Sequence, residues 1–374
     1  MKKLLITTIL VLCFVNALYA DTTEDQLIDE IVSQVDTEEL RLIVEQLSGA
    51  KPLDDGSFIV TRRVGTEENK KAADFIAEQY SNIENLDIKI DRFNALRTGR
   101  LEKLVFKLIV APTLDDEVVK ATIDGFDLGI DFLRKNNIRR CKNILATLRG
   151  ETSQFVFTTA HYDSMVWNLD GTEIIEDALA PGADDNATGV AATIIAARIL
   201  SQYSFTNSIC FMNPDLEELM MYGSTSYVLQ HMLGLKRIKS VINIDMIGYD
   251  HDSDGLLNVL YGEDSMKDVV SKEYNRLELE IDPVFLSVDA LSNQSEHTLL
   301  PSDHLSFYTF GVATVVSFNE GWWLSETEYG DNENNIAYHT EDETIDTINF
   351  PYMTEIVKLY VATLAREAGV IGKR

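Results

Sequence analysis

Five short segments, far apart in the chain, carry acidic or imidazole side chains of the kinds that bind metal ions. They are His161-Tyr162-Asp163, the stretch 181–189 with its Asp184-Asp185 pair, the pair Glu217-Glu218, Asp245 and His339. Two adjacent zinc ions require one imidazole each and several carboxylates, one of which can bridge them. The residue types therefore predict a two-metal site and hydrolytic chemistry.

The elements that would position these groups alternate between strands and helices. Apolar runs at 154–160, 208–212 and 239–246 predict strands, and helices are expected at 186–203, 218–232 and 352–368, with a further strand at 312–318. This order predicts an α/β fold with a mixed, mainly parallel central sheet and helices on both faces. In such sheets ligands bind outside the carboxyl ends of the strands, where the candidate residues fall.

The first third of the chain supplies earlier elements and one irregular segment. Helices are predicted at 37–48, after the capping residue Asp36, and from Thr66 to residue 81, followed by strands at 86–93 and 143–148. Residues 94–140 fit the pattern poorly: 104–110 resembles a strand and 124–129 is undecided. We expect an insertion there that shapes the rim of the cleft, within a single domain spanning 21–374.

The amino terminus has the order of a secretory signal. Met1-Lys2-Lys3 precedes an apolar stretch at 4–15 and small residues up to Ala20. This order predicts a signal peptide at 1–20, cleavage near Ala20 and a secreted or periplasmic protein. An uncleaved anchor is the alternative, but the apolar run is short for a membrane span. Cys141 and Cys210 lie beside apolar strand patterns, which favours two free thiols over a disulfide.

The charge balance excludes some partners. Asp and Glu number 61 against 32 Lys and Arg, a net charge of −29. Nucleic-acid binding requires clustered basic residues, so it is excluded as a function, and anionic membrane surfaces are disfavoured. A monomer with no membrane contact after signal removal is expected.

Six segments together resemble a known family. In chain order they are 161–164, 180–189, 216–218 followed by Gly223-Ser224, 244–246, 302–304 and 338–340. They resemble the successive site segments of the co-catalytic dinuclear zinc exopeptidases, the family of the secreted bacterial leucyl aminopeptidases. Any one tripeptide is a weak signal, but six in order are a strong one.

The resemblance implies two zinc ions per chain and a role for each site residue. Five ligands would hold the ions: Asp184 as the bridge, His161 and Asp245 at one ion, and Glu218 and His339 at the other. Glu217 would take a proton from the water between the ions and give it to the leaving amine. Asp163 would orient the imidazole of His161. Support from outside the ligand shell is expected of Asp185, Ser302 and Asp303, and His304 is interpreted as a structural residue.

The implied reaction is hydrolysis of the amino-terminal bond of peptides or proteins with a free α-amine. An apolar recess for a side chain such as Leu is expected from Met246, Phe318, Trp322, Trp323 and Tyr338, although Met246 and Phe318 suit an ordinary core equally well. The stretch 298–301 lacks the cysteine and tyrosine that some relatives carry before the Ser-Asp-His segment. Fine specificity therefore does not follow from the resemblance.

Three other functions stay open at this point. A single-zinc glutaminyl cyclase on the same fold would form pyroglutamate at amino-terminal glutamine. A catalytically inactive binding domain on a peptidase scaffold would have lost ligands, whereas this chain has all of them. Carboxypeptidase or dipeptidase action is disfavoured only by the family resemblance.

Overall fold

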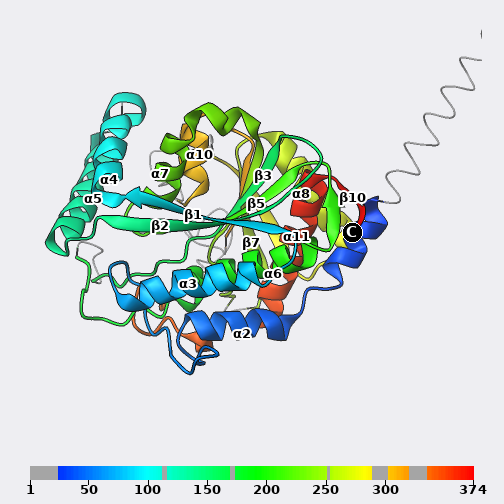
Figure 1. Cartoon of the computed structure of the whole chain (residues 1–374), viewed down its shortest axis with the longest axis horizontal. Helices are drawn as coiled ribbons and strands as arrows, with labels where there is room; N and C mark the ends of the chain where they lie inside the picture. Colours follow the sequence, from blue (N-terminus) through cyan, green and yellow to red (C-terminus); the bar gives the residue numbers. More distant parts are fainter. Residues whose placement is uncertain (1–23, 112–115, 169–172, 251–252, 289–301, 320–334) are drawn as a thin grey trace, which may run out of the picture.

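The computed structural model describes residues 24–111, 116–168, 173–250, 253–288, 302–319 and 335–374, so the predicted signal peptide lies outside the described residues. Its centre is an eight-stranded sheet of order β1-β2-β5-β3-β6-β9-β7-β8 (Figure 1). The strands are β1 (Leu86–Asn94), β2 (Arg140–Leu148), β3 (Phe155–Thr159), β5 (Ser208–Asn213), β6 (Ile238–Ile244), β7 (Leu256–Tyr261), β8 (Asp282–Ser287) and β9 (Val315–Asn319). A second, two-stranded sheet pairs β4 (Tyr203–Phe205) with β10 (Val370–Lys373).

The strand directions confirm the predicted mixed, mainly parallel sheet. Pairings of β3 with β5, β3 with β6, β6 with β9 and β7 with β8 are parallel. The pairs β1–β2, β2–β5 and β7–β9 are antiparallel. Because β5, β3 and β6 are adjacent and parallel, their carboxyl ends meet at one edge of the sheet.

Helices cover both faces of the sheet. One face packs against α3 (Glu67–Ser81), α6 (Gly189–Leu200), α8 (Asp264–Leu277) and α11 (Phe350–Ala368), with α2 (Thr37–Leu47) outside α6 (Figure 1). The other face packs against α7 (Tyr222–Gln230) and α10 (His304–Thr309). Shorter helical turns are η3 (Ala183–Thr188), η4 (Met232–Arg237) and η5 (Ile345–Thr347). With both faces covered, β5 is buried at every residue.

Local signals fixed the early helices as predicted. The carboxylate of Asp36 accepts the backbone N–H of Glu38 at 2.9 Å and that of Glu39 at 3.0 Å, which satisfies two free donors at the start of α2. Thr66 caps α3 in the same way through the N–H of Asn69. The elements β7, α8 and β8 had not been predicted.

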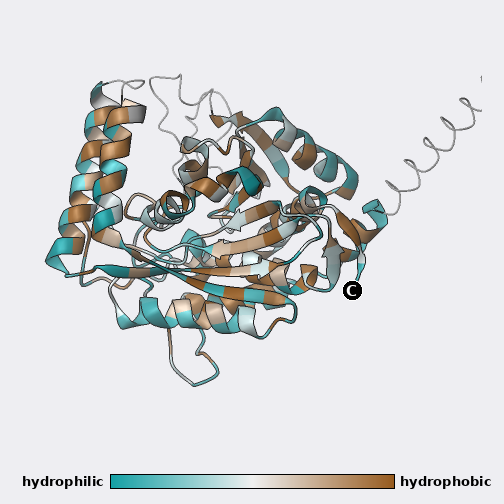
Figure 2. Ribbon diagram, turned by 45° about the horizontal axis from the view of Figure 1, so that its top comes forward, coloured by the Kyte–Doolittle hydropathy of each residue, from teal (hydrophilic) through white to brown (hydrophobic). Residues whose placement is uncertain are grey.

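The segment 94–140 differs from expectation. It forms α4 (Ala95–Val105), the π-helical turn η1 (Phe106–Val110) and α5 (Asp116–Lys135), so the strand expected at 104–110 is wrong. The side chain of Asn94 caps α4, and Phe106 packs on Phe126 of α5 with ring centroids 5.7 Å apart. A short apolar run is compatible with a strand or a buried helix, and here the packing of α4 against α5 favours the helix. Figure 2 shows the α4–α5 pair at one end of the sheet, with hydrophobic residues interspersed along both helices.

Two further expectations bear on the rest of the chain. Cys141 and Cys210 are buried free thiols, as predicted. Among the described residues, no helix combines the length and apolar character required to cross a bilayer.

Candidate metal centre

The candidate ligands come from the edge where β3, β5 and β6 end. His161 lies two residues beyond β3, Asp245 directly follows β6, and Glu217-Glu218 follow β5. Asp185 lies in η3, immediately before α6, and His339 in the connection before α11. The parallel register therefore brings together groups that lie up to 178 positions apart in the chain, from residue 161 to residue 339.

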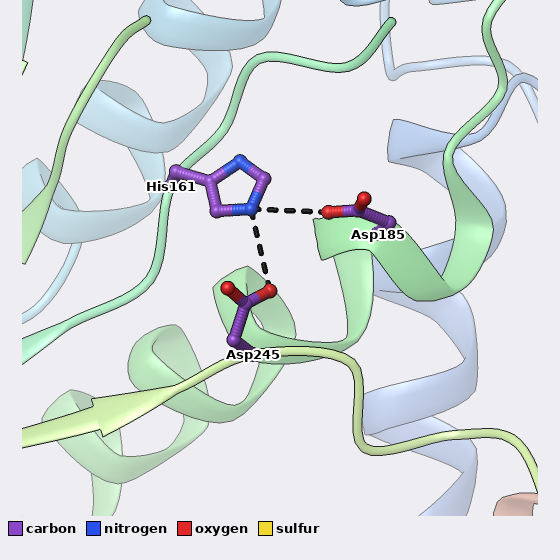
Figure 3. Close-up of side chains that lie close together, drawn as sticks. All are labelled: His161, Asp185 and Asp245. Atoms are coloured by element: carbon purple, nitrogen blue, oxygen red, sulfur yellow. Dashed lines mark ion pairs between the residues drawn. The ribbon is translucent and has the colours of Figure 1, made fainter. Parts of the chain in front are cut away.

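A first group consists of His161, Asp185 and Asp245 (Figure 3). Nε2 of His161 lies 3.0 Å from Oδ1 of Asp185 and 3.3 Å from Oδ1 of Asp245. The ligand atoms of the three residues lie within 4.8 Å of one another, and all three residues are buried. One imidazole nitrogen facing two carboxylates is a suitable donor set for zinc.

A second group shares Asp185 with the first and adds Glu218 and His339. Nε2 of His339 lies 3.1 Å from Oδ2 of Asp185 and 2.7 Å from Oε2 of Glu218. The two oxygens of Asp185 thus face two different histidines. A carboxylate in this position can bridge two ions.

The structure corrects the predicted bridge. We expected Asp184 to be the shared ligand and Asp185 to support it, but Asp185 is the aspartate that belongs to both candidate groups. Oδ1 of Asp184 accepts the backbone N–H of Gly248 at 2.8 Å, and its Oδ2 accepts a hydrogen bond from the Asn335 amide at 3.3 Å. The carboxylate of Asp184 is therefore used within the protein, whereas that of Asp185 faces the histidines.

The electrostatics of both groups suit bound cations. Burial lowers the pKa of His339, but the charges of Glu218 and Asp185 outweigh burial and raise it to about 10. His161 behaves likewise: burial lowers its pKa, and Asp245 with the other carboxylates raises it well above the usual value. Among the described residues, Oε1 of Glu218 is buried without a hydrogen-bond partner, and Oδ1 of Asp245 and Nε2 of His339 have none beyond the histidine–carboxylate contacts given above. Buried carboxylate and imidazole atoms left with so few hydrogen-bond partners are suited to bind metal ions.

Glu217 lies beside the two groups without belonging to either. Its Oε2 is 4.0 Å from Nε2 of His161. Burial raises its pKa well above the usual range, and although the charge of His161 lowers it, Asp245, Asp303 and Glu218 raise it further. A carboxylate with a raised pKa next to a metal site is suited to take and return a proton.

The predicted supporting residues lie around these groups. The backbone carbonyl of Asp163 lies 3.2 Å from Nδ1 of His161 and its carboxylate 3.6 Å away, so the main-chain oxygen is the closer partner. Ser302 donates a hydrogen bond of 2.6 Å to Oδ2 of Asp245 and accepts one of 2.9 Å from Asn243. These contacts orient one histidine and one carboxylate of the first group.

Asp303 and His304 are buried near the centre but belong to neither group. Burial raises the pKa of Asp303 to about 7, against the opposing charge of His161. Burial lowers the pKa of His304 to about 3, so its imidazole is neutral.

The predicted side-chain recess is only partly present in the described residues. Met246 and Tyr338 line a small cavity of about 30 Å³ next to the metal groups, together with Leu260. Phe318 does not line it: its ring packs on Tyr360 of α11 with centroids 6.4 Å apart. Alternation along β9 explains the difference, because Ser317 and Asn319 point to the cavity and Phe318 to the opposite face. Trp322 and Trp323 lie outside the described residues.

One aromatic residue beside the centre was missed from the sequence. The ring centroid of Trp167 lies 6.3 Å from that of His339 with the planes at 25°, and the ring of Tyr338 stacks on the same histidine with centroids 3.7 Å apart. The backbone N–H of Trp167 donates to the carbonyl of His339 at 3.0 Å. The only sequence signal for a role of Trp167 at the site was its position shortly after the 161–164 segment, and this signal is weak.

The fold and site together define the class of metal-dependent α/β hydrolases whose ligands come from the carboxyl edge of a mixed sheet. Residues 143–364, well over half of the chain, match the model of peptidase family M28. The chain therefore belongs to this family, and the predicted kinship with the zinc aminopeptidases is confirmed.

Individual relatives agree with this assignment. The chain is 28% identical over 225 residues to leucine aminopeptidase 1 of Aspergillus clavatus, covering 58% of this chain and 53% of that relative. It therefore spans about half the length of that curated relative. The structure resembles BSAP, a zinc aminopeptidase from Bacillus subtilis, with a TM-score of 0.63 at 19% identity, over 90% of this chain and 96% of BSAP.

A structure with a different activity shares the fold. Porphyromonas gingivalis glutaminyl cyclase has a TM-score of 0.60 at 14% identity, covering 89% of this chain and 98% of the cyclase. Likeness at this identity concerns the fold alone and does not assign a function.

Proposed function

We propose that this protein is a zinc-dependent aminopeptidase with two zinc ions per chain. The observation that carries the proposal is the position of Asp185, whose two oxygens face His161 at 3.0 Å and His339 at 3.1 Å. Asp245 completes the first set of ligands and Glu218 the second. Zinc held by these residues would supply Lewis acidity, which polarises a carbonyl group and lowers the pKa of water.

The protein residues would manage the proton and the geometry. Glu217 would accept the proton of the attacking water on its carboxylate and then donate it to the nitrogen of the leaving amine, so that the proton count balances. Its Oε2 lies 4.0 Å from Nε2 of His161 and belongs to neither ligand set, so metal binding would leave it available for this role. The hydrogen bond from Ser302 would keep Asp245 in its ligand orientation.

The substrate class follows from the shape and charge of the site. A free α-amine carries a positive charge, and the carboxylates of Asp185, Glu217 and Asp245 line the cavity beside the metal groups. Met246 and Leu260 form its apolar part. We therefore propose peptide or protein amino termini as substrates, with a preference for apolar first residues such as Leu.

The setting of the enzyme is also a proposal. The order of residues 1–20 supports export by a cleaved signal peptide, giving a secreted or periplasmic protein. Residues 21–374 would then form one catalytic domain with the α4–α5 pair as an insertion, acting as a monomer.

The test combines metal analysis with a substrate panel. Elemental analysis of the purified protein should give two zinc ions per chain. Leu-, Ala- and Glu-anilides should be hydrolysed, Leu most rapidly, whereas N-acetyl-Leu-anilide should resist because its amine is blocked. One ion per chain would contradict the two-metal proposal, and cleavage of the acetylated substrate would contradict aminopeptidase action.

A glutaminyl cyclase is the second candidate, because that activity occurs on the same fold. Such an enzyme would join the α-amine of an amino-terminal glutamine to its side-chain carbonyl carbon and release ammonia. The peptide would keep all of its residues, with pyroglutamate at the amino terminus. Incubation with a Gln-peptide and mass spectrometry separate the two: hydrolysis releases free glutamine, whereas cyclisation lowers the peptide mass by that of ammonia.

A further inference from the structure

Arg62 is the only buried lysine or arginine among the residues that the structure describes, and its side chain is fully enclosed. All of its guanidinium contacts are backbone carbonyl oxygens. Nε donates to Tyr162 at 2.9 Å, Nη1 to Leu47 at 3.0 Å and to Pro181, and Nη2 to Gly182 at 2.7 Å and to Asp185 at 3.2 Å. A buried cation so fully paired has a single available orientation.

All but one of these carbonyls belong to the segments that carry the proposed ligands. Tyr162 lies between His161 and Asp163, and Pro181, Gly182 and Asp185 belong to one turn, whereas the remaining contact, Leu47, is the last residue of α2. One guanidinium therefore ties the segment of His161 to the turn of Asp185. Its backbone N–H adds a third link, donating to Oγ of Ser164 at 3.0 Å.

Glu343 holds the same turn through its N–H groups. Oε1 of Glu343 accepts the backbone N–H of Asp184 at 3.1 Å and that of Asp185 at 2.6 Å. Its own carbonyl accepts the N–H of Ala183 at 3.0 Å. Donors from Arg62 and acceptors from Glu343 thus fix the carbonyls and the amides of one short turn.

The turn itself permits this arrangement only with glycine at its second position. Gly182 has φ +52°, and a Cβ there would lie 2.2 Å from the carbonyl oxygen of Asp185 and 2.8 Å from Nη2 of Arg62. The guanidinium therefore occupies the space that a side chain would fill. The turn and the arginine fit one another as a unit.

Arg62 also contributes the permanent positive charge of the region. The carboxylates that interact with it most strongly are those of Glu343, Asp185, Asp163 and Glu218. Like charges at such close range oppose their own assembly, and a fixed cation among them reduces that repulsion. Arg62 thus supports the site by charge as well as by hydrogen bonds.

We propose that Arg62 and Glu343 are positioning residues that hold Asp185 in the bridging orientation before metal binds. Neither touches the reacting atoms. The inference rests on the proposed two-metal function. In it, two residues outside the ligand set determine the orientation of the Asp185 carboxylate.

The test measures metal binding rather than turnover alone. Arg62→Lys keeps the charge but loses the fork of donors, and Arg63→Lys is the matched control because Arg63 makes no contact with the turn among the interactions described. Cobalt titration of the metal-free proteins should show Arg62→Lys binding about 10- to 100-fold more weakly, with an altered visible spectrum of bound cobalt, while Arg63→Lys matches the wild type. Unchanged affinity and spectrum in Arg62→Lys, even with a lower melting temperature, would show a purely structural role.

A second pair of variants decides the matter if Arg62→Lys does not fold. Glu343→Gln keeps an oxygen acceptor for the two amides, whereas Glu343→Ala removes it. We expect the glutamine variant to bind cobalt within a few-fold of the wild type and the alanine variant at least tenfold more weakly. Equal binding by the two variants would overturn the proposal. Normal cobalt binding by the wild type without release of amino acids would instead refute the proposed function and leave this inference standing.

Discussion

Asp163 accepts the backbone N–H of Glu217 on one carboxylate oxygen, at 3.1 Å, and the adjacent N–H of Glu218 on the other, at 3.3 Å. Its own backbone oxygen faces Nδ1 of His161. A single residue therefore links a histidine of the first metal group to the proposed base and to a ligand of the second group. The two groups form one unit through Asp163 as well as through Asp185.

Replacing Asp163 should disturb this link. Asp163→Ala removes both acceptors, and we expect kcat/KM on Leu-anilide to fall about 10- to 100-fold because the loop of Glu217 loses its anchor. Asp163→Asn retains one acceptor oxygen and should lose less. Steady-state kinetics with zinc analysis checks both variants, and equal losses in the two would argue against anchoring by hydrogen bonds.

Replacing Glu217 should abolish proton transfer without removing metal. Glu217→Gln keeps the shape of the side chain but cannot accept the proton, so kcat should fall by about 10²- to 10⁴-fold. Zinc content should be unchanged because Glu217 belongs to neither metal group. Glu151→Gln, at an exposed glutamate, is the control. Retained turnover in Glu217→Gln would mean that another residue moves the proton.

The adjacent aspartates should give opposite results. Asp185→Asn should weaken binding of both ions because the carboxylate is shared, and activity should fall with it. Asp184→Asn should keep both ions and instead lose on the order of 1–2 kcal/mol of stability, since its carboxylate bonds to Gly248 and Asn335 within the protein. Zinc analysis and urea unfolding of the two variants check this. Metal loss confined to Asp184→Asn would restore Asp184 as the bridge.

Metal removal should destabilise the protein more strongly as the pH rises. In the metal-free state, burial raises the pKa of Glu218 to about 7, and the surrounding carboxylates raise that of His339 to about 10. The folded state then holds protons that the unfolded state has released, from about pH 4.5 for the glutamate and from 6.5 for the histidine. Stability of the metal-free protein therefore falls as the pH rises through 7 towards 10.

Thermal unfolding with and without a chelator at pH 6 and pH 8.5 tests this dependence. Zinc replaces the protons as the counter-charge, so the difference in melting temperature between the two states should be larger at pH 8.5. A difference that shrinks with rising pH would be inconsistent with the buried histidine–carboxylate clusters.

Glu102, which lies outside both metal groups, should produce a separate pH effect. Its carboxyl group on α4 is buried, which raises its pKa to about 8 although a hydrogen bond from Thr225 lowers it, and its Oε2 has no partner among the described residues. The unfolded state ionises near pH 4.5 and the folded state near 8, so this group lowers stability across that interval. Glu102→Gln should flatten the fall, as measured by chemical unfolding between pH 5 and 8. A curve unchanged by the substitution would show that the carboxyl group reaches water.

Several features of the protein could be predicted from local patterns. The caps at Asp36 and Thr66 fixed the starts of α2 and α3, because capping involves residues within one turn. The apolar runs before His161 and Asp245 placed these side chains at the ends of β3 and β6. The end of a strand can be recognised from nearby residues, and the carboxyl ends of adjacent parallel strands lie at one edge of the sheet. The meeting of His161 and Asp245 could therefore be predicted from the alternation of strands and helices.

Other features depended on contacts between distant residues. Asp184 and Asp185 have the same chemistry, and the choice between them is made by backbone dihedral angles that Arg62 and Glu343 hold from 120 and 158 positions away along the chain. The run at 104–110 became helical because α4 found α5 as a partner, and Phe318 turned to the core through the register of β9. Residue types and spacing thus determined which groups meet at the sheet edge. Tertiary packing alone decided which of two neighbouring side chains faces the site. A change of backbone orientation by one residue leaves the residue types and their spacing unchanged, so the sequence pattern does not reveal it.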